Sequence, residues 1–187
     1  MLDDYFQQVR ITLSKDGRTV VTASPLASNF SSDPTAISTP DPGSHPDNFP
    51  TPPVHIYMDK EPTQISFFTS TKTTLREVYD QAKARNKNLI ESTPDGEDSD
   101  VLMYNQDDQI TEATISNVAF YRAPYWLTPS TTSGCLPGVM RAWLLKNDQI
   151  REDSDEILTT ESIHEGEWVL LFNGVQGCRL GKICRRT

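Results

Sequence analysis

The sequence has few cysteines, no long apolar run and no excess of positive charge, and each of these absences excludes a class of protein. Its three cysteines, at positions 135, 178 and 184, are odd in number and none belongs to a CxxC pair, so a disulfide framework and a cysteine zinc site are excluded. No apolar stretch approaches the roughly 20 residues that a membrane helix requires. The acidic start, residues 1–5, lacks the apolar region of a secretory signal. We therefore predict a cytoplasmic protein without membrane association and without a metal site.

Charge and length narrow the remaining classes. The chain carries 17 basic and 26 acidic residues, a net charge of −9, and nucleic-acid phosphates are bound through Lys and Arg, so nucleic-acid binding is not expected. Mean hydropathy is −0.51, which is typical of a soluble protein. A length of 187 residues suits one domain or two small ones and is enough to bury a hydrophobic core.

Three segments differ in composition and predict three structural units. Residues 1–23 contain a stretch, 8–23, in which apolar and polar side chains alternate on both sides of a turn at Gly17, and this predicts a β-hairpin. Residues 24–53 hold eight of the 13 prolines, which predicts a linker or a long surface loop. From residue 54 onward, apolar strand patterns and amphipathic helix patterns predict an α/β domain over 54–187.

Within this domain the pattern predicts two helices and several buried strands. The first helix is expected from residue 75 to an asparagine at 86 or 88, with Thr74 and Glu77 as a capping box. Its buried stripe is expected to consist of Leu75, Val78, Tyr79 and Ala82. The second is expected from Pro137, a favourable first helical position, to about residue 146, with positions 139, 142 and 143 on one side and Met140 and Leu144 widening this apolar stripe. Strands are expected at 55–58, 101–104, 118–122 and 167–172.

Two ionisable side chains are candidates for chemistry. Lys72 lies between an apolar stretch and the first helix, where partial desolvation would lower its pKa and make it a nucleophile for imine formation. Taken alone, it is more simply a solvated surface lysine. Glu112 directly precedes an apolar strand, where a buried carboxylate could pair with a protonated ring nitrogen; the plainer interpretation is a carboxylate at the edge of the protein.

Two backbone segments are candidates for binding phosphate. Gly138 opens the second helix, and the free N–H groups at a helix start, together with the positive end of the helix dipole, attract anions. Residues 173–175 form a polar turn after the last strand and can supply further N–H donors. Each segment is also compatible with an ordinary loop-to-helix transition or a simple chain turn.

The order of these segments resembles that of the class IV pyridoxal-phosphate enzymes. The matching blocks look like the segments of the Schiff-base lysine, the acidic residue, the phosphate helix and the final phosphate turn, at residues 71–76, 110–118, 126–141 and 171–175. No single block is specific, but their combination is, and it covers about residues 54–180. The resemblance implies an α/β protein with the D-amino-acid-aminotransferase fold, fold type IV.

The same resemblance implies a role for each candidate residue. Lys72 would carry pyridoxal 5'-phosphate as a Schiff base and move protons, Glu112 would pair with the pyridine nitrogen, and Asn117 would also contact the cofactor. The cofactor supplies the electron sink, and the protein orients and tunes it. A small-molecule amino substrate and a homodimer are implied as partners. The phosphate would be held around Gly138, Val139, Met140, Asn173 and Gly174.

Within the family the chain is most similar to aminodeoxychorismate lyase, which converts 4-amino-4-deoxychorismate to 4-aminobenzoate and pyruvate in folate biosynthesis. Residues 72–76 and 173–175 carry this similarity. An aminotransferase of the branched-chain or D-amino-acid type, and a truncated member without catalysis, stay open as alternatives. The family opens with a small domain, of which only the hairpin in 1–23 is recognisable. We therefore expect an N-terminally truncated chain with an essentially complete large domain and an incomplete small one, which lacks an arginine contact to the phosphate.

Overall fold

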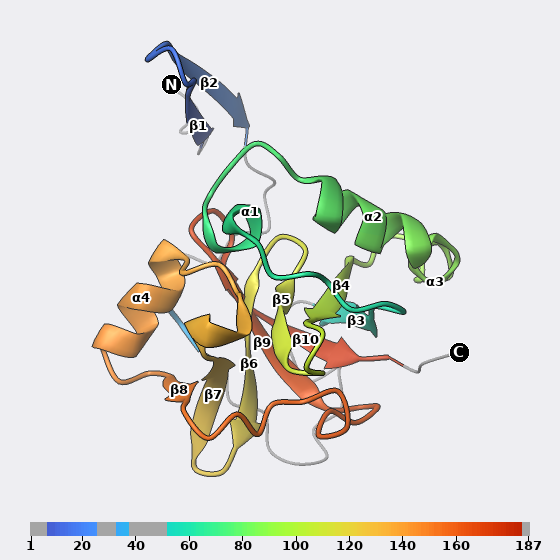
Figure 1. The fold of residues 1–187 in the computed structure, drawn as a ribbon. Helices are drawn as coiled ribbons and strands as arrows, with labels where there is room; N and C mark the ends of the chain where they lie inside the picture. Colours follow the sequence, from blue (N-terminus) through green and yellow to red (C-terminus); the bar gives the residue numbers. More distant parts are fainter. Residues whose placement is uncertain (1–6, 26–32, 38–51, 185–187) are drawn as a thin grey trace, which may run out of the picture.

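A computed structural model describes residues 7–25, 33–37 and 52–184 of the chain (Figure 1). Strands β1 (Gln7–Leu13) and β2 (Thr19–Pro25) pair antiparallel and form the hairpin predicted for residues 8–23. Gly17 in its turn has a φ of +83°, a left-handed conformation that glycine adopts at little steric cost. The residues of β2 are all exposed, and the hairpin is a sheet of its own beside the main body in Figure 1.

The main body is built on an eight-stranded mixed sheet with the order β5-β4-β3-β10-β9-β6-β7-β8. The pairs β10–β3, β3–β4 and β7–β8 are parallel, and the other neighbouring pairs are antiparallel. The strands are β3 (Val54–Met58), β4 (Ser99–Tyr104), β5 (Ile110–Ala113), β6 (Asn117–Arg122), β7 (Tyr125–Pro129), β8 (Arg151–Asp153), β9 (Trp168–Asn173) and β10 (Gly177–Ile183).

The four strands that the sequence predicted in this sheet are confirmed as β3, β4, β6 and β9; β5, β7 and β8 were not predicted, and neither was β10. This strand lies in the middle of the sheet, between β3 and β9, although it contains Arg179 and Lys182. Gly181 permits this placement, because a Cβ atom there would lie 3.0 Å from side-chain atoms of Ile56 and Leu171. A half-buried basic strand gives little hydrophobic signal, so the pattern alone could not identify it.

The sheet curls around a hydrophobic core. Strand β5, at one edge, contacts β6 and β7, from which it is separated by several strands in the sheet order. Successive residues point to opposite faces of a strand, so Phe120 lies in the inner cluster with Ile56 and Leu171, and Ala119 faces an outer cluster with Leu170. The short connection at residues 114–116 therefore links β5 to β6 although the two strands are far apart in the sheet order.

Helices pack on the outer side of the sheet at its opposite ends (Figure 1). Tyr79 and Ala82 of α2 pack against Val101 and Met103 of β4, whereas Leu144 of α4 joins the outer cluster beside β9. The short helices α1 and α3 flank α2 in the sequence. The helical segments are α1 (Phe67–Ser70), α2 (Glu77–Arg85), α3 (Lys87–Glu91), the 3-10 turn η2 (Thr131–Ser133) and α4 (Val139–Lys146).

Helix α2 begins later than predicted, and the predicted capping box is wrong. Arg76 is the N-cap residue and no side chain caps the helix. The preceding chain instead forms a local turn, in which Thr73 Oγ1 accepts from the Leu75 amide at 3.2 Å, and this competes with helix formation. Leu75 is consequently 49% exposed instead of buried. The predicted end at Asn86 is confirmed, because Asn86 is the C-cap residue.

Helix α4 is rotated relative to the prediction. Gly138 is its N-cap residue, so Pro137 lies before the helix and not at its first position. Val139 and Trp143, expected inside, are 77% and 40% exposed. The buried side contains Leu144, which belonged to the predicted stripe, together with Arg141, whose Nη2 donates to the Pro129 carbonyl oxygen at 2.8 Å. A buried arginine with its own hydrogen bonds cannot be anticipated from an apolar stripe.

The Pro-rich stretch at 24–53 lies largely outside the described residues. Its described part at 33–37 contacts the main sheet, since the Cys178 amide donates to the Pro34 carbonyl oxygen at 2.8 Å and Ile37 packs against the outer cluster. These five residues therefore do not behave as a free spacer. The prediction for 26–32 and 38–51 falls on residues outside the description.

Candidate active site

One cavity of about 820 Å³ brings together every residue that the sequence predicted for the site. It lies where β5, β6 and β9 end or begin, and the hairpin contributes Gln8 and Pro25 to its wall. A cavity of this size can hold a phosphate-bearing aromatic cofactor together with a small substrate. The predicted residues on its wall are Lys72, Glu112, Asn117, Gly138, Val139, Met140, Asn173 and Gly174.

Lys72 lies in the coil between α1 and α2, on the wall of this cavity. The prediction of a desolvated lysine is wrong for this structure, because Lys72 is exposed. The physical reason is that the coil is open on its outer side, where Ser70 and Thr74 are also exposed. Lys72 therefore offers its ammonium group to the cavity from the solvent side.

Glu112, by contrast, is a buried carboxylate, with 5% of its surface exposed. It belongs to β5, and its Oε1 accepts a hydrogen bond from the Tyr79 hydroxyl at 2.8 Å. Burial raises the pKa of Glu112 to about 7, while the Tyr79 hydrogen bond, the Leu136 backbone and the Lys72 charge act in the opposite direction. Among the described residues, no Lys or Arg forms an ion pair with it. A buried carboxylate without a bound cation is costly and is a ready acceptor for a cationic N–H group.

A short loop, residues 114–116, sets the relative position of Glu112 on β5 and Asn117 on β6. Arg76 Nη2 donates to the Thr114 carbonyl oxygen at 2.5 Å, and the Thr114 hydroxyl donates to the buried carboxylate of Asp100. The Ala113 amide donates to the Ser116 carbonyl oxygen at 2.8 Å. The loop is thus held at both of its ends by the chain around it.

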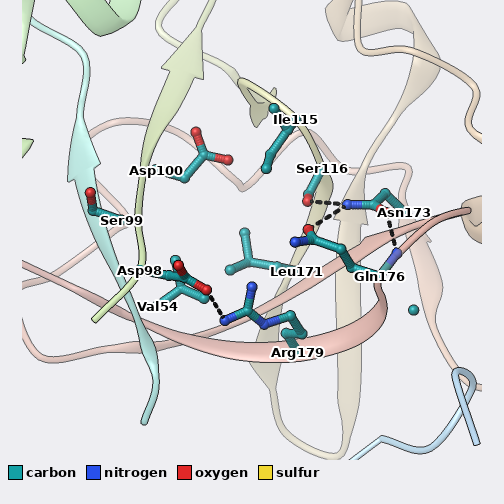
Figure 2. A pocket seen from close by; sticks show the side chains of 11 residues that line it. Val54, Asp98, Ser99, Asp100, Ile115, Ser116, Leu171, Asn173, Gln176 and Arg179 are labelled. Carbon is teal, nitrogen blue, oxygen red and sulfur yellow. Dashed lines mark hydrogen bonds and ion pairs between the residues drawn. The ribbon is translucent and has the colours of Figure 1, made fainter. Parts of the chain in front are cut away.

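A second, small cavity of about 90 Å³ lies on the other side of this loop and is shown in Figure 2. Ser116, Asn173 and Gln176 point toward one another in this view and separate the small cavity from the large one, whose walls they also line. Asn173 Nδ2 donates to Ser116 Oγ at 3.0 Å and to Gln176 Oε1 at 3.1 Å. The turn after β9 is therefore tied to the loop that follows Glu112.

Asn117 and Gly138 form a close contact at the start of α4. Asn117 Nδ2 donates to the Leu136 carbonyl oxygen at 2.7 Å, and a Cβ atom at position 138 would collide with Asn117 Oδ1. Only glycine therefore fits at this N-cap position while Asn117 keeps its hydrogen bond. The amides of Val139 and Met140 belong to the first helical turn, whose N–H groups have no acceptor within the helix.

Asn173 has a mainly structural task in the turn after β9. Its Oδ1 accepts from the amides of Val175 and Gln176 at 2.9 and 2.7 Å. Since those two amides are used within the turn, Gly174 is left as its candidate anion donor. Gly174 faces α4 closely, because a Cβ atom there would lie 3.0 Å from Val139 Cγ2. The turn and the helix start thus form two sides of one backbone-lined corner, which suits an anion such as phosphate.

The sequence analysis missed Tyr79 and Arg76, which also line the cavity. Tyr79 was placed in the buried stripe of the first helix as an apolar residue. A buried tyrosine hydroxyl usually needs a hydrogen-bond partner, so the sequence indicated that Tyr79 would meet a polar group. The apolar stripe did not indicate which group this would be. The loop residue Ser116 and the hairpin residues Gln8 and Pro25 were missed as well, because they reach the site only through the fold.

The described residues contain neither a candidate membrane-spanning helix nor a candidate metal-binding cluster. No helix within 7–25, 33–37 and 52–184 has the length and apolar character needed to cross a bilayer. In the same part of the chain, no group of His, Cys, Asp and Glu side chains is arranged to bind a metal ion. The three cysteines are all unpaired, and Cys135, beside the site, is buried, which raises the pKa of its thiol to about 11.

Comparison with known proteins assigns this constellation to a family. The family model for Amino-transferase class IV matches residues 3–182, so the chain belongs to that family. Enzymes of this family depend on pyridoxal phosphate. The predicted family and the predicted mixed α/β fold are both confirmed.

Two curated relatives share a more specific name. The chain is 38% identical over 135 residues to a Schizosaccharomyces pombe protein named "Putative aminodeoxychorismate lyase", covering 71% of this chain and 54% of that protein. It is 34% identical over 139 residues to "Aminodeoxychorismate lyase" of Saccharomyces cerevisiae, covering 68% and 36%. The chain therefore spans about half and about a third of the length of these relatives.

A solved structure supports the fold independently. The branched-chain amino acid aminotransferase of Thermobaculum terrenum, crystallised in its pyridoxal-phosphate form, superposes with a TM-score of 0.61 at 16% identity. The match covers 88% of this chain and 48% of that one. At this level of identity the similarity shows the shared fold alone.

Proposed function

We propose that this chain forms the cofactor-binding part of an aminodeoxychorismate lyase, which converts 4-amino-4-deoxychorismate to 4-aminobenzoate and pyruvate in folate biosynthesis. The observation that carries the proposal is the single cavity in which Lys72 and the buried Glu112 meet the glycine-opened start of α4. The names of the two yeast relatives favour a lyase over other members of the family.

The residues of the cavity fit pyridoxal 5'-phosphate. Glu112 is a buried carboxylate that forms no ion pair with a described Lys or Arg, and a protonated pyridine nitrogen would supply the missing charge. The corner between Gly138, Val139 and Gly174 lies on the cavity wall, where the first-turn N–H groups of α4 suit an anion. Lys72 provides an amine that can condense with an aldehyde. When bound, the cofactor supplies an electron sink for bond cleavage next to the substrate amine.

The chain's own groups then have separate tasks. Lys72 holds the cofactor and afterwards carries a proton on Nζ between positions of the substrate. Glu112 keeps the proton on the ring nitrogen, and the amides of Val139, Met140 and Gly174 hold the phosphate. Asn117 acts indirectly on the phosphate site, because its hydrogen bond fixes the Leu136 carbonyl beside the helix start. The overall elimination needs neither an oxidant nor a reductant.

Product analysis tests this function. The purified chain, incubated with pyridoxal phosphate and 4-amino-4-deoxychorismate, should release pyruvate and 4-aminobenzoate in equal amounts, and Lys72→Ala should release neither. An amino acid with a keto acid forms the second arm. Sustained amino transfer in that arm, with no pyruvate in the first, would reject the lyase assignment.

A class IV aminotransferase is the second candidate, and the superposition on the branched-chain enzyme is the observation that favours it. Lys72, Glu112 and the phosphate corner serve both reactions equally. A chain that binds the cofactor but is inactive in both arms would instead support the non-catalytic alternative, in which this segment lacks part of the substrate site.

We also propose a homodimer in the cytoplasm that acts on a small-molecule amino substrate. Exposed apolar side chains such as Phe67 and Val139 give a second copy surface to cover, and three unpaired cysteines suit a reducing compartment. Light scattering coupled to gel filtration tests the dimer, which a mass near 21 kDa would contradict.

A further inference from the structure

Tyr79 and Glu112 form a buried pair on the wall of the candidate active site. Their exposed fractions are 7% and 5%, and the Tyr79 hydroxyl donates to Glu112 Oε1 at 2.8 Å. The pair joins two elements that are 33 residues apart, since Tyr79 belongs to α2 and Glu112 to β5. The direction of this hydrogen bond matters: a donated O–H stabilises the carboxylate in its ionised form.

Arg76 fixes the Tyr79 ring from one side. Its guanidinium carbon lies 4.6 Å from the centre of that ring, and its Nη2 donates to the Thr114 carbonyl oxygen at 2.5 Å. Arg76 is also the N-cap residue of α2. One side chain therefore connects the start of the helix, the tyrosine ring and the loop that follows Glu112. These contacts hold the Tyr79 ring where its hydroxyl reaches the Glu112 carboxylate.

We propose that Tyr79, held in place by Arg76, is a positioning residue that keeps Glu112 ionised where the ring nitrogen of the cofactor binds. This inference rests on the proposed function for the cofactor's orientation, but the hydrogen bond that carries it exists in the chain alone. Tyr79 itself need not touch substrate or cofactor.

The groups that face Glu112 support this role. Burial is the main influence and raises the pKa of Glu112 to about 7, and the Tyr79 hydrogen bond is the first of the effects that oppose it, ahead of the Leu136 backbone, Lys72 and Arg76. The pKa of Tyr79 is raised, mainly by its own burial, so its hydroxyl stays a proton donor at physiological pH. Cys135, whose thiol pKa burial raises to about 11, remains neutral there. Without the Tyr79 hydrogen bond the pKa of Glu112 would be higher still, and a smaller share of the carboxyl would carry the negative charge that pairs with a protonated ring nitrogen.

A titration of the cofactor-free protein tests the proposal directly. Carbon-13 NMR of glutamate-labelled protein follows the Glu112 carboxylate from pH 4 to pH 9, with Glu112→Gln to assign its signal. In Tyr79→Phe we expect the midpoint to rise by about one to two pH units, the effect of losing one hydrogen bond to a charged group. The matched control is Tyr57→Phe, which removes another buried hydroxyl, bonded to Thr93 Oγ1 at 3.1 Å, and should leave the midpoint unchanged.

Arg76→Lys provides a second route if Tyr79→Phe does not fold. Lysine keeps the positive charge but cannot stack as a plane on the ring while bonding the Thr114 carbonyl, so the midpoint should again rise. A wild-type midpoint in either folded variant, as judged by circular dichroism, would overturn the proposal. Pyridoxal phosphate is then added to each protein. If no visible band forms even in the wild type, the proposed function fails, while the titration still decides the role of Tyr79.

Discussion

Replacing Glu112 by glutamine removes a buried charge from the candidate site while keeping an acceptor for the Tyr79 hydroxyl. Burial raises the pKa of Glu112 from its ordinary value of 4.5 to about 7. Each pKa unit corresponds to about 1.4 kcal/mol, so an ionised Glu112 costs the folded, cofactor-free chain roughly 3 kcal/mol. That cost is a large part of the stability of a typical domain.

The pH dependence of this effect has a defined sign. Below pH 4.5 the carboxyl is protonated in both the folded and the unfolded chain, and no cost arises. As the pH rises from 4.5 to 7 the unfolded chain ionises first, so the free energy of unfolding of the wild type falls, and above pH 7 the full cost applies. Glu112→Gln should therefore match the wild type near pH 4.5 and exceed it by roughly 3 kcal/mol at pH 8.

Urea unfolding of the cofactor-free proteins, followed by circular dichroism at several pH values, measures this difference. Asp100, whose pKa burial also raises, is present in both proteins and cancels in the comparison. Two stability curves that run parallel between pH 4.5 and 8 would refute the reasoning, because they would mean that Glu112 titrates in the folded chain as it does in the unfolded one.

Three further predictions concern Lys72, the glycines of the phosphate corner and Asp100. Lys72→Ala should abolish the visible absorbance of covalently bound cofactor, whereas the exposed Lys146→Ala should keep it; equal spectra would remove Lys72 from its role. Gly138→Ala should weaken cofactor binding by roughly tenfold or more, because it displaces the Asn117 amide from its hydrogen bond. Gly174→Ala should weaken binding less, because its Cβ meets only a methyl group of Val139. The reverse ranking of the two affinities in a fluorescence titration would contradict the phosphate corner. Asp100→Ala should lower the free energy of unfolding by about 1–3 kcal/mol, because it removes the oxygen to which the buried Thr114 hydroxyl and Val101 amide both donate, and an unchanged urea midpoint would show that these two hydrogen bonds are dispensable.

The order of the functional segments could be read from the sequence, and local patterns located most of the elements that carry them. The hairpin and the strands β3, β4, β6 and β9 follow from alternation and apolar runs, which are properties of neighbouring residues. The helix details were less accessible. The predicted cap was lost to a local turn at Thr73, and the inner side of α4 includes the buried Arg141, whose guanidinium donates to a backbone carbonyl; neither feature shows in an apolar stripe.

Contacts over long sequence separations were decided by the tertiary structure. His55 meets Glu97 and Cys184, 42 and 129 residues away, although the spacing of these residues gave no indication of it. The exposure of Lys72 is a similar case, because it depends on which elements leave its coil uncovered. The central position of β10 likewise depends on a glycine that lets two neighbouring strands approach.

The sequence by itself determined the family: a lysine, a carboxylate, a glycine-opened helix and a polar turn succeed one another in a recognisable order. Only the tertiary structure decided that these four parts face one cavity. It also decided that the carboxylate is buried and hydrogen-bonded to Tyr79, and that the lysine is exposed to solvent. The physical reason is that residue type and order are fixed along the polymer, whereas burial and hydrogen-bond partners arise when a curled sheet brings distant segments together.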